Sequence, residues 1–256
     1  MEKISVVLAV FNEEENLKEC LNSIKDFANE IVIVDGGSSD KTLDIAKQFN
    51  AKIIKTNNPP IFHINKNKAI DSATGDWILQ LDADEIVSEK LKKEIERAIQ
   101  NSSINGFWVP RRNFFLSRFL TKGGQYPDYT LRLYRKDKGR LPAKDVHEQA
   151  VVEGKVGYLK NDLLHIRDKN FSIYIQRFKR YTDLLATQMK DRGEKINLIS
   201  FINYIILKPF LWFIMVYIRH RGYVDGFPGF VFAFFSSLRF PVSFFKLWKI
   251  YERGSL

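Results

Sequence analysis

Short apolar runs alternate with amphipathic stretches over the first hundred residues. The runs "ISVVLAV" (4–10) and "IVIVD" (31–35) are nearly continuous and rich in β-branched residues, as in strands that are buried on both faces. The stretch "LKECLNSI" (17–24) between them places its apolar residues at i, i+3, i+4 and i+7, which is the spacing of one helix face. The pattern predicts a strand, a helix and a second strand in succession.

The same alternation continues to about residue 100. Further strands are predicted at 51–55 ("AKIIK") and 76–82 ("DWILQLD"). Helices are predicted after the capping residues 38–40, around 67–73, and from Ser88 onwards. Strands that alternate with helices in this way form a mostly parallel sheet with right-handed crossovers. The sequence therefore predicts an α/β fold whose ligands bind outside the carboxyl ends of the strands.

Polar residues follow three of the predicted strands. Asn12 and Glu13 come after the first, "DGGS" (35–38) ends the second, and "DAD" (82–84) ends the fourth. Because carboxyl ends of parallel strands meet at one edge of a sheet, we expect these residues to converge on one cleft. Oxygen ligands suit Mg²⁺ and Mn²⁺, and sites with few carboxylates leave positions for substrate phosphates. Asp82 and Asp84 are therefore candidate metal ligands, although an isolated D-x-D also occurs in plain polar turns.

The stretch "VDGGSSD" (34–40) allows two interpretations. It lacks the G-x-G-x-x-G spacing and the Lys-Ser/Thr pair, which disfavours a dinucleotide-binding loop and a P-loop. Asp35 is suited to accept hydrogen bonds from the N–H edge of a base, and Gly36 lets the backbone approach a ligand closely. The alternative is a tight turn from strand to helix that needs glycine and is capped by Asp40.

The chain after about residue 105 has a different pattern. Strand-like pieces with many turn residues fill 106–167, and a polar helical stretch follows at 171–195. The apolar segment 196–218 is long enough to cross a bilayer, but we expect Lys208-Pro209 to break it in the middle. An interfacial or re-entrant helix pair, with the basic residues 219–221 at the head groups, fits this pattern. The alternative is a buried helix in a dimer interface.

Composition narrows the possible partners. The 256 residues carry a net charge of +10, and 196–256 holds seven Lys or Arg against two acids together with 17 of the 35 aromatic residues. Basic charge beside apolar sequence is typical of a surface that meets anionic lipid, and the chain offers no recognised nucleic-acid module. A single cysteine, Cys20, excludes an intramolecular disulfide and a cysteine-rich zinc site, which favours a reducing compartment. The opening "MEKISVVLAV" shows no secretory signal.

Several stretches resemble the family 2 glycosyltransferases. These are "SVVLAVFNEEENLKECLNSI", "EIVIVDGGSSDKTLDIA" and "NKAIDSATGDWILQLDADE", in order and with similar gaps over residues 4–86. The resemblance implies the GT-A fold, a nucleotide-diphosphate sugar donor, and transfer with inversion. The later "GGQYPDYTLRLYR", "VHE" and "RGYVDGFPGFVFAF" resemble bacterial glycosyltransferases that build lipopolysaccharide core or related surface glycans.

The resemblance also implies roles for individual residues. Ala9, which stands where the family commonly has proline, borders the nucleoside with Asn12 and Glu13. Asp35 contacts the base, and Asp82 and Asp84 form the metal-diphosphate motif. Asp128 is the base that deprotonates the acceptor, with Glu148 as the competitor because Pro127 replaces the usual Glu. The remaining expectations are phosphate contacts by Lys66 and Lys68, a phosphate or acceptor contact by Arg132, a third metal ligand at His147, and a packed or hydrogen-bonded His165.

Together these inferences predict an inverting, Mg²⁺- or Mn²⁺-dependent hexosyltransferase. We expect a GT-A catalytic domain at 1–170, made of a nucleotide-sugar half (1–100) and an acceptor half (101–170), and a helical membrane-associating region at 171–256. The donor is a UDP-hexose, first UDP-glucose, and the acceptor is a lipid-linked or lipopolysaccharide-type glycan at the cytoplasmic side of the bacterial inner membrane. Homo-oligomerisation is possible. Two alternatives stay open, a polyprenyl-phosphate sugar synthase and a non-catalytic basic membrane adaptor.

Overall fold

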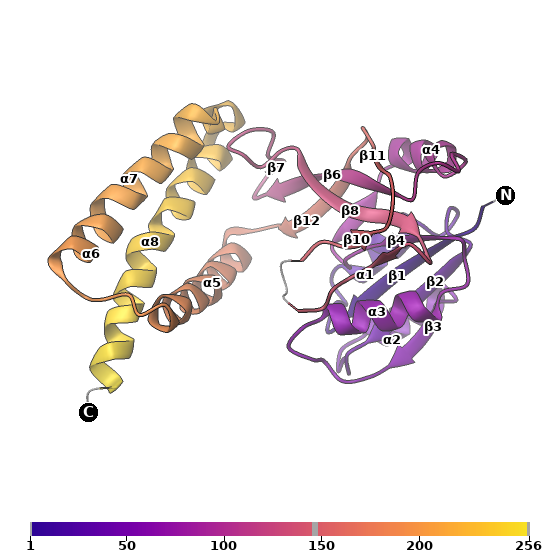
Figure 1. The fold of residues 1–256 in the computed structure, drawn as a ribbon, viewed down its shortest axis with the longest axis horizontal. Coiled ribbons are helices and arrows are strands. Elements are labelled where there is room, and N and C mark those ends of the chain that lie inside the picture. Colours follow the sequence, from indigo (N-terminus) through magenta and orange to yellow (C-terminus); the bar gives the residue numbers. More distant parts are fainter. Residues whose placement is uncertain (1, 145–147, 255–256) are drawn as a thin grey trace. The chain divides into compact units, whose positions relative to one another are not determined.

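The computed structural model describes residues 2–144 and 148–254 and separates into two units (Figure 1). The first unit contains residues 1–112 and 128–166, and the second contains 113–127 and 167–256. Strands β6 and β12 continue from the first unit into the second. Each unit is described separately below.

Within the described residues, the main sheet has ten strands, in the order β3-β2-β1-β4-β8-β6-β12-β5, with β11 and β7 also pairing with β6. The strands β3 to β4 in this order are parallel, and β8 then runs antiparallel to β4 and to β6. The parallel half confirms the α/β prediction. The bounds are β1 (Ile4–Val10), β2 (Glu30–Asp35), β3 (Lys52–Lys55), β4 (Trp77–Gln80), β5 (Glu85–Val87), β6 (Gly106–Phe115), β7 (Arg118–Phe119), β8 (Asp128–Arg135), β11 (Val156–Tyr158) and β12 (Leu163–Asp168).

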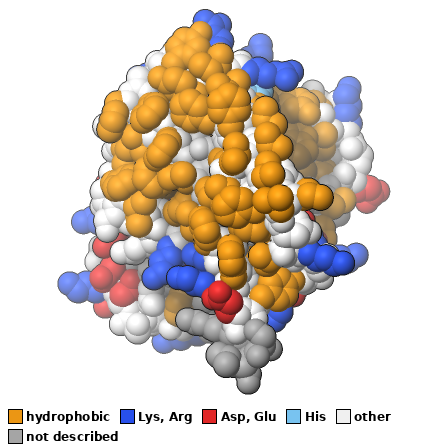
Figure 2. Space-filling model, turned by 90° about the vertical axis from the view of Figure 1, so that its left-hand side faces the viewer, with side chains coloured by type: hydrophobic (Ala, Val, Ile, Leu, Met, Phe, Trp, Pro, Cys, Tyr) orange, Lys and Arg blue, Asp and Glu red, His pale blue; other side chains and the backbone are white. Residues whose placement is uncertain are grey.

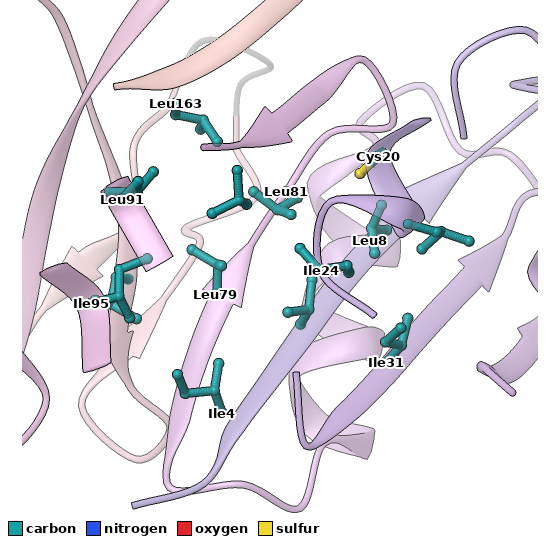
Figure 3. Packing of buried hydrophobic residues seen from close by; sticks show 14 of the residues in the cluster. Ile4, Leu8, Cys20, Ile24, Ile31, Leu79, Leu81, Leu91, Ile95 and Leu163 are labelled. Carbon is teal, nitrogen blue, oxygen red and sulfur yellow. The ribbon is translucent and has the colours of Figure 1, made fainter. Parts of the chain in front are cut away.

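Helices pack apolar residues against this sheet because their hydrophobic stripes must be buried. Figure 3 shows side chains from the strands and from α1 and α4 in one cluster, including Leu8, Leu79, Cys20 and Ile95. A second cluster joins β1, β2 and α3 with strands β4 and β8. The helices are α1 (Leu17–Asn22), α2 (Thr42–Gln48), α3 (His63–Ser72) and α4 (Glu89–Ala98), and a separate two-stranded sheet pairs β9 (Gly139–Arg140) with β10 (Val151–Val152).

Most of the predicted elements of this unit are confirmed. The strand at 4–10 has the predicted bounds, and Ser88 caps α4 by accepting a hydrogen bond from the Leu91 amide. The helix predicted around 67–73 begins earlier, at His63. Residues 38–40 do not provide the N-cap of α2, which is Lys41, although the Asp40 carboxylate accepts from the Thr42 amide at 2.9 Å.

The second unit is mainly helical. The long α5 packs along α8, and the segment from Leu198 to Arg219 packs against α8 from another side. Two stretches, Leu198–Arg219 and Gly222–Glu252, are long and apolar enough to cross a membrane by length and composition. The bounds are α5 (Phe171–Asp191), α6 (Leu198–Ile202), η1 (Asn203–Leu207), α7 (Lys208–Phe213), η2 (Ile214–Arg219), η3 (Gly222–Asp225) and α8 (Gly226–Gly254).

The prediction that Lys208-Pro209 breaks the first apolar segment is wrong. The chain stays helical from Leu198 to Arg219. Pro209 lies at the start of α7, and π-helical turns precede and follow that helix. A proline removes one backbone donor and its ring crowds the preceding turn, and a wider π turn at that point accommodates both effects.

The turn between the two apolar helices is held by a buried carboxylate. Asp225 accepts hydrogen bonds from the amides of Thr121 and Lys122 at 2.9 and 2.8 Å and from the Thr121 hydroxyl at 2.7 Å. The first turns of α8 also pass very close to this loop. A Cβ at Gly229 would lie only 2.0 Å from the carbonyl oxygen of Gly222.

Gly229→Ala should therefore destabilise the second unit by about 1–3 kcal/mol, because the added methyl group pushes α8 away from the turn. Thermal unfolding in detergent measures this effect. Phe227→Ala is the control, since this side chain is 73% exposed and its truncation should leave the melting temperature unchanged. An unchanged melting temperature for Gly229→Ala would show that the close approach does not determine the packing.

Candidate active site

Asp82 lies directly beyond β4, where Leu81 donates its amide to the Val7 carbonyl of β1 at 3.1 Å. Both carboxylate oxygens of Asp82 are in ion pairs. Oδ1 lies 2.5 Å from Nζ of Lys66 on α3, and Oδ2 lies 2.5 Å from Nη2 of Arg132 on β8. The Lys66 and Arg132 side chains are almost completely buried. Asp82 is therefore neutralised by two cations that come from elements far apart in the sequence.

The ion pairs continue from Arg132 to the predicted catalytic base. Arg132 Nη2 also lies 2.7 Å from Oε1 of the fully buried Glu85, and Arg111 Nη1 lies 3.5 Å from the same oxygen. Arg111 then holds Asp128 through Nε and Nη2, at 2.9 and 2.7 Å from Oδ2. Asp128 is partly exposed, so it meets solvent at one end of a network that is buried at the other.

Burial and charge shift the pKa values of this network in different directions. Burial alone would raise the pKa of Asp82, but the guanidinium of Arg132 and the ammonium of Lys66 hold it well below the usual range. Burial lowers the pKa of Lys66, and nearby Arg132 lowers it further, against the opposing effect of Asp82. Ionised Asp82 thus stabilises the fold above its unfolded pKa of about 4, and this contribution is lost as the pH falls through the lowered folded value.

Asp84 has a different environment from Asp82. Its Oδ2 lies 3.2 Å from Nε2 of His165 on β12, and its backbone carbonyl accepts from the Ile166 amide at 2.8 Å. The carboxylate is partly exposed, whereas His165 is buried. The pairing arises because β12 runs antiparallel to β5, which begins one residue after Asp84.

Glu13 belongs to the same acidic region. Burial raises its pKa, and although a hydrogen bond from Asn16 at 3.0 Å opposes this rise, the charges of Asp84 and Asp82 add to it. Cys20 lies beneath these acids, with Sγ 3.6 Å from the Asp82 carbonyl oxygen. Burial raises the pKa of its thiol well above the usual value, and the surrounding carboxylates raise it further. The end of β1 and the end of β4 therefore converge, as the sequence predicted.

The end of β2 forms a tight turn. The buried Asp35 carboxylate accepts from the amides of Gly37 and Ser38 at 3.1 and 3.2 Å. Gly36 donates its amide to the Val10 carbonyl of β1, which ties the two strand ends together. Asn12 has a left-handed backbone, with φ of 54°, and its side-chain oxygen accepts from the Ser39 amide at 2.8 Å. The tight turn that needs glycine is present, with Gly37 at φ of 92°, but Lys41 rather than Asp40 is the N-cap of the following helix. A contact between Asp35 and a base stays a prediction.

The other predicted residues lie as follows. Ala9 is on β1 opposite Val34. Lys68 is exposed on α3, with Nζ 2.7 Å from the Thr56 hydroxyl at the end of β3. Glu148 accepts from the Lys144 amide at 3.0 Å, and no described contact joins it to the acids at 82–85. His147 lies outside the described residues.

The donor set beside Asp84 fits a divalent cation in part. Among the described residues no group of three or more His, Cys, Asp or Glu side chains could hold a metal ion. The Asp84 carboxylate is nevertheless a ligand that Mn²⁺ and Mg²⁺ accept when phosphate oxygens complete the coordination, and it contacts the His165 imidazole, a nitrogen donor of the kind that transition metals accept. Asp82, by contrast, already has cationic partners on both oxygens.

Residues 5–151 match the model of the "Glycosyl transferase family 2". The chain belongs to glycosyl transferase family 2. Relatives that match nearly the whole chain include the "Lipopolysaccharide core biosynthesis glycosyltransferase LpsC" of Rhizobium meliloti, at 29% identity over 99% of this chain and 93% of that protein. An "Uncharacterized glycosyltransferase" of Rickettsia typhi is 26% identical over 93% of this chain and 86% of its own length.

Among solved structures, S. aureus TarS has the same fold as this family 2 chain. The likeness has a TM-score of 0.51 at 18% identity and covers 90% of this chain. The chain spans 48% of the length of TarS. The GT-A expectation from the sequence is thereby confirmed as a fold.

The sequence does not identify Glu85 and Arg111 as residues of the network, and it predicts His165 only as a packed or hydrogen-bonded residue. The position of His165, directly after "LL" on a short strand, carries no signal of its contact with Asp84. The i+3 spacing of Asp82 and Glu85 around a turn was the available signal for Glu85, whose Oε2 accepts from the Asp82 amide at 2.9 Å.

Arg132→Met should destabilise the first unit by about 3–5 kcal/mol, because it leaves the fully buried Glu85 and the partly buried Asp82 without their shared cation. Arg140→Met is the matched control. Arg140 also pairs with an aspartate, Asp71, but both side chains are more than half exposed, and exposed pairs contribute about 1 kcal/mol or less. Chemical denaturation at pH 7 measures both variants. Equal losses for Arg132→Met and Arg140→Met would contradict the structural role of the network.

Proposed function

We propose that this family 2 chain transfers a hexose, with inversion, from a UDP-sugar to a hydroxyl of a lipopolysaccharide-core or other surface-glycan acceptor. The observation that carries the proposal is the unequal state of the two D-x-D acids. Asp82 is fixed by Lys66 and Arg132, and Asp84 lies against His165 next to the converging strand ends. Such a site has the ligands for one divalent cation and a diphosphate.

Asp84 and His165 would hold the Mg²⁺ or Mn²⁺ ion. A bound divalent cation stabilises negative charge on the departing nucleotide diphosphate. In the same site, Asp82 forms ion pairs with two cationic groups, Lys66 and Arg132. We assign Asp82 a positioning role, through its ion pairs, in place of the direct metal contact predicted from the sequence.

Asp128 is the proposed base. Transfer to a hydroxyl needs a group that accepts the hydroxyl proton as the oxygen attacks. The Asp128 carboxylate is partly exposed, and Arg111 fixes its orientation through two donors. Glu148 has no described contact with this network, which favours Asp128 over Glu148.

The acceptor and the location are inferred from different sources. The relative described as a lipopolysaccharide core biosynthesis glycosyltransferase supports a surface-glycan acceptor. The two apolar helices of the second unit support a site of action at a membrane. The UDP moiety and the cytoplasmic side of the membrane rest on the sequence resemblance alone.

His165→Ala and Asp84→Asn should each lower Mn²⁺-dependent transfer by more than about a hundredfold, which exceeds the usual loss for residues that merely orient a ligand. Thermal unfolding measures how much Mn²⁺ and UDP together raise the melting temperature. This rise should disappear in both variants, because a ligand stabilises only the state that binds it. His220→Ala and Asp44→Asn, at exposed positions, are the controls. Retained Mn²⁺-dependent stabilisation in His165→Ala would exclude it as a ligand.

Asp128→Asn should lower kcat by about 10²–10⁴-fold with little change in donor affinity, because the amide cannot accept the proton. Glu148→Gln should leave kcat nearly unchanged. Single-turnover transfer and donor binding by calorimetry separate the two effects. Full activity of Asp128→Asn would instead indicate an acceptor that needs no base, such as a polyprenyl phosphate. Absence of transfer by the wild-type protein with every donor would favour the non-catalytic adaptor.

A further inference from the structure

The helices of the second unit expose a continuous apolar surface. Exposed hydrophobic side chains recur every four residues along the helical segment Leu198–Arg219, which we call the first apolar helix. They recur at three- or four-residue spacing along parts of α8. Figure 2 shows hydrophobic side chains gathered over the side of the molecule that these helices form. We call this set the apolar face, and it comprises Ile202, Ile206, Phe210, Ile214 and Ile218 of the first apolar helix and Phe227, Phe230, Phe234, Phe245 and Trp248 of α8.

Helix α5 occupies another side of α8 along much of its length. Phe178 of α5 contacts Phe235, with ring centroids 5.9 Å apart, and Lys246 donates to the Thr182 hydroxyl of α5 at 2.8 Å. Phe235 and Lys246 each directly follow a residue of the apolar face, so α5 and the apolar face lie on different sides of α8. The two sides of the helix therefore meet different surroundings.

Helix α5 carries exposed charged side chains. These include Lys179, Arg180, Lys190 and Asp191, and the exposed Asp183 pairs with Lys246 of α8 at 2.7 Å. A charged side chain at the centre of a bilayer costs about 2.5–3.5 kcal/mol even on the lowest scale. A helix that crosses a bilayer and packs against a charged helix would carry those charges into the hydrocarbon. Because α5 packs along α8, a crossing by α8 would place charged residues of α5 in the bilayer. Only the apolar face is available to hydrocarbon.

Cations near the middle of both apolar helices also disfavour a crossing. Lys208 lies midway along Leu198–Arg219, with Nζ 3.5 Å from the centroid of the Tyr204 ring. Arg239 lies midway along α8, with Cζ 4.0 Å from the Trp212 ring. In a helix that lies in the membrane plane, such side chains extend along the apolar surface and place their charge at the head groups.

The charge around the apolar face favours anionic lipid over a second copy of the chain as its partner. Residues 196–256 hold seven Lys or Arg against two acids, and one of these acids, Asp225, is buried against Thr121 and Lys122. A second copy of the same surface would bring a like charge against it, whereas an anionic leaflet brings the opposite charge. The apolar face is therefore better matched to lipid than to itself.

We propose that the two apolar helices lie flat in one leaflet of an anionic membrane as a hairpin and do not cross the bilayer. This inference rests on the membrane site of action proposed above and adds the topology. The apolar face contacts acyl chains, α5 stays on the aqueous side, and the turn at 219–221 and the far end of α8 lie on the same side of the membrane.

Cysteine labelling tests the topology, because Cys20 is the only cysteine and is fully buried. In a Cys20→Ala background, His220→Cys marks the turn and Lys249→Cys marks the far part of α8, and both positions are exposed. The full chain in right-side-out and inside-out bacterial membrane vesicles is treated with a charged, impermeant maleimide. Both cysteines should react in the same preparation. Reaction of the two in opposite preparations would establish a crossing and overturn the proposal.

Two further positions test the orientation. Phe210→Cys on the apolar face should lose reactivity on binding to vesicles of phosphatidylglycerol and phosphatidylcholine, whereas Lys190→Cys on α5 should keep it. Protection of Lys190→Cys by vesicles would contradict the aqueous placement of α5. Protection of Phe210→Cys in dilute detergent, together with a dimeric mass, would make a second copy the occupant and overturn the proposal.

A matched pair of variants measures the contribution of the apolar face. Phe210→Ser with Phe227→Ser should weaken vesicle binding at least about tenfold, because two large apolar side chains leave the lipid. Tyr158→Ser with Val151→Ser removes similarly exposed apolar groups from the first unit and should leave binding unchanged. Equal binding of both double variants would overturn the proposal. Transfer to a short soluble acceptor is measured in parallel, so a failed glycosyltransferase assignment is distinguished from a failed topology.

Discussion

The ion pair between Asp82 and Arg132 joins the parallel half of the sheet to its antiparallel half, since Asp82 follows β4 and Arg132 lies on the neighbouring β8. Lys66 adds α3 to the same carboxylate, and Glu85 and Arg111 extend the network to Asp128. Buried charges persist in a fold only when they are paired. Asp82 and the proposed base Asp128 therefore belong to one network of ion pairs whose members stabilise each other.

This network gives the two acids of "DAD" different chemistry although one residue separates them. Asp82 is surrounded by cations, and its pKa is held low by Arg132 and Lys66 against the effect of burial. Asp84 is about as exposed as Asp82, but it meets an imidazole, His165, in place of the two cations. An acid that is already paired with two cations gains little from a metal ion, whereas an acid without such partners gains more. The partners of each acid, rather than the D-x-D motif itself, determine which of the two is suited to a metal cation.

The sequence predicted the parts of the fold that local patterns determine. Strand 4–10, the cap at Ser88 and the meeting of strand ends follow from periodicity and from the rule for parallel sheets. Contacts such as Asp84 to His165 depend on the antiparallel pairing of β5 with β12, which joins residues about eighty positions apart and leaves no local signal. The prediction at Pro209 is wrong because proline usually breaks a helix, whereas here π-helical turns on both sides of α7 keep the chain helical.

The most direct test of this account is the location of manganese by anomalous scattering in crystals grown with Mn²⁺ and a UDP-hexose. We predict one peak in contact with the Asp84 carboxylate and the His165 imidazole, with the diphosphate completing the coordination and Asp82 still paired to Lys66 and Arg132. A peak bound by Asp82 with those ion pairs broken, or a diphosphate remote from Asp84, would contradict it.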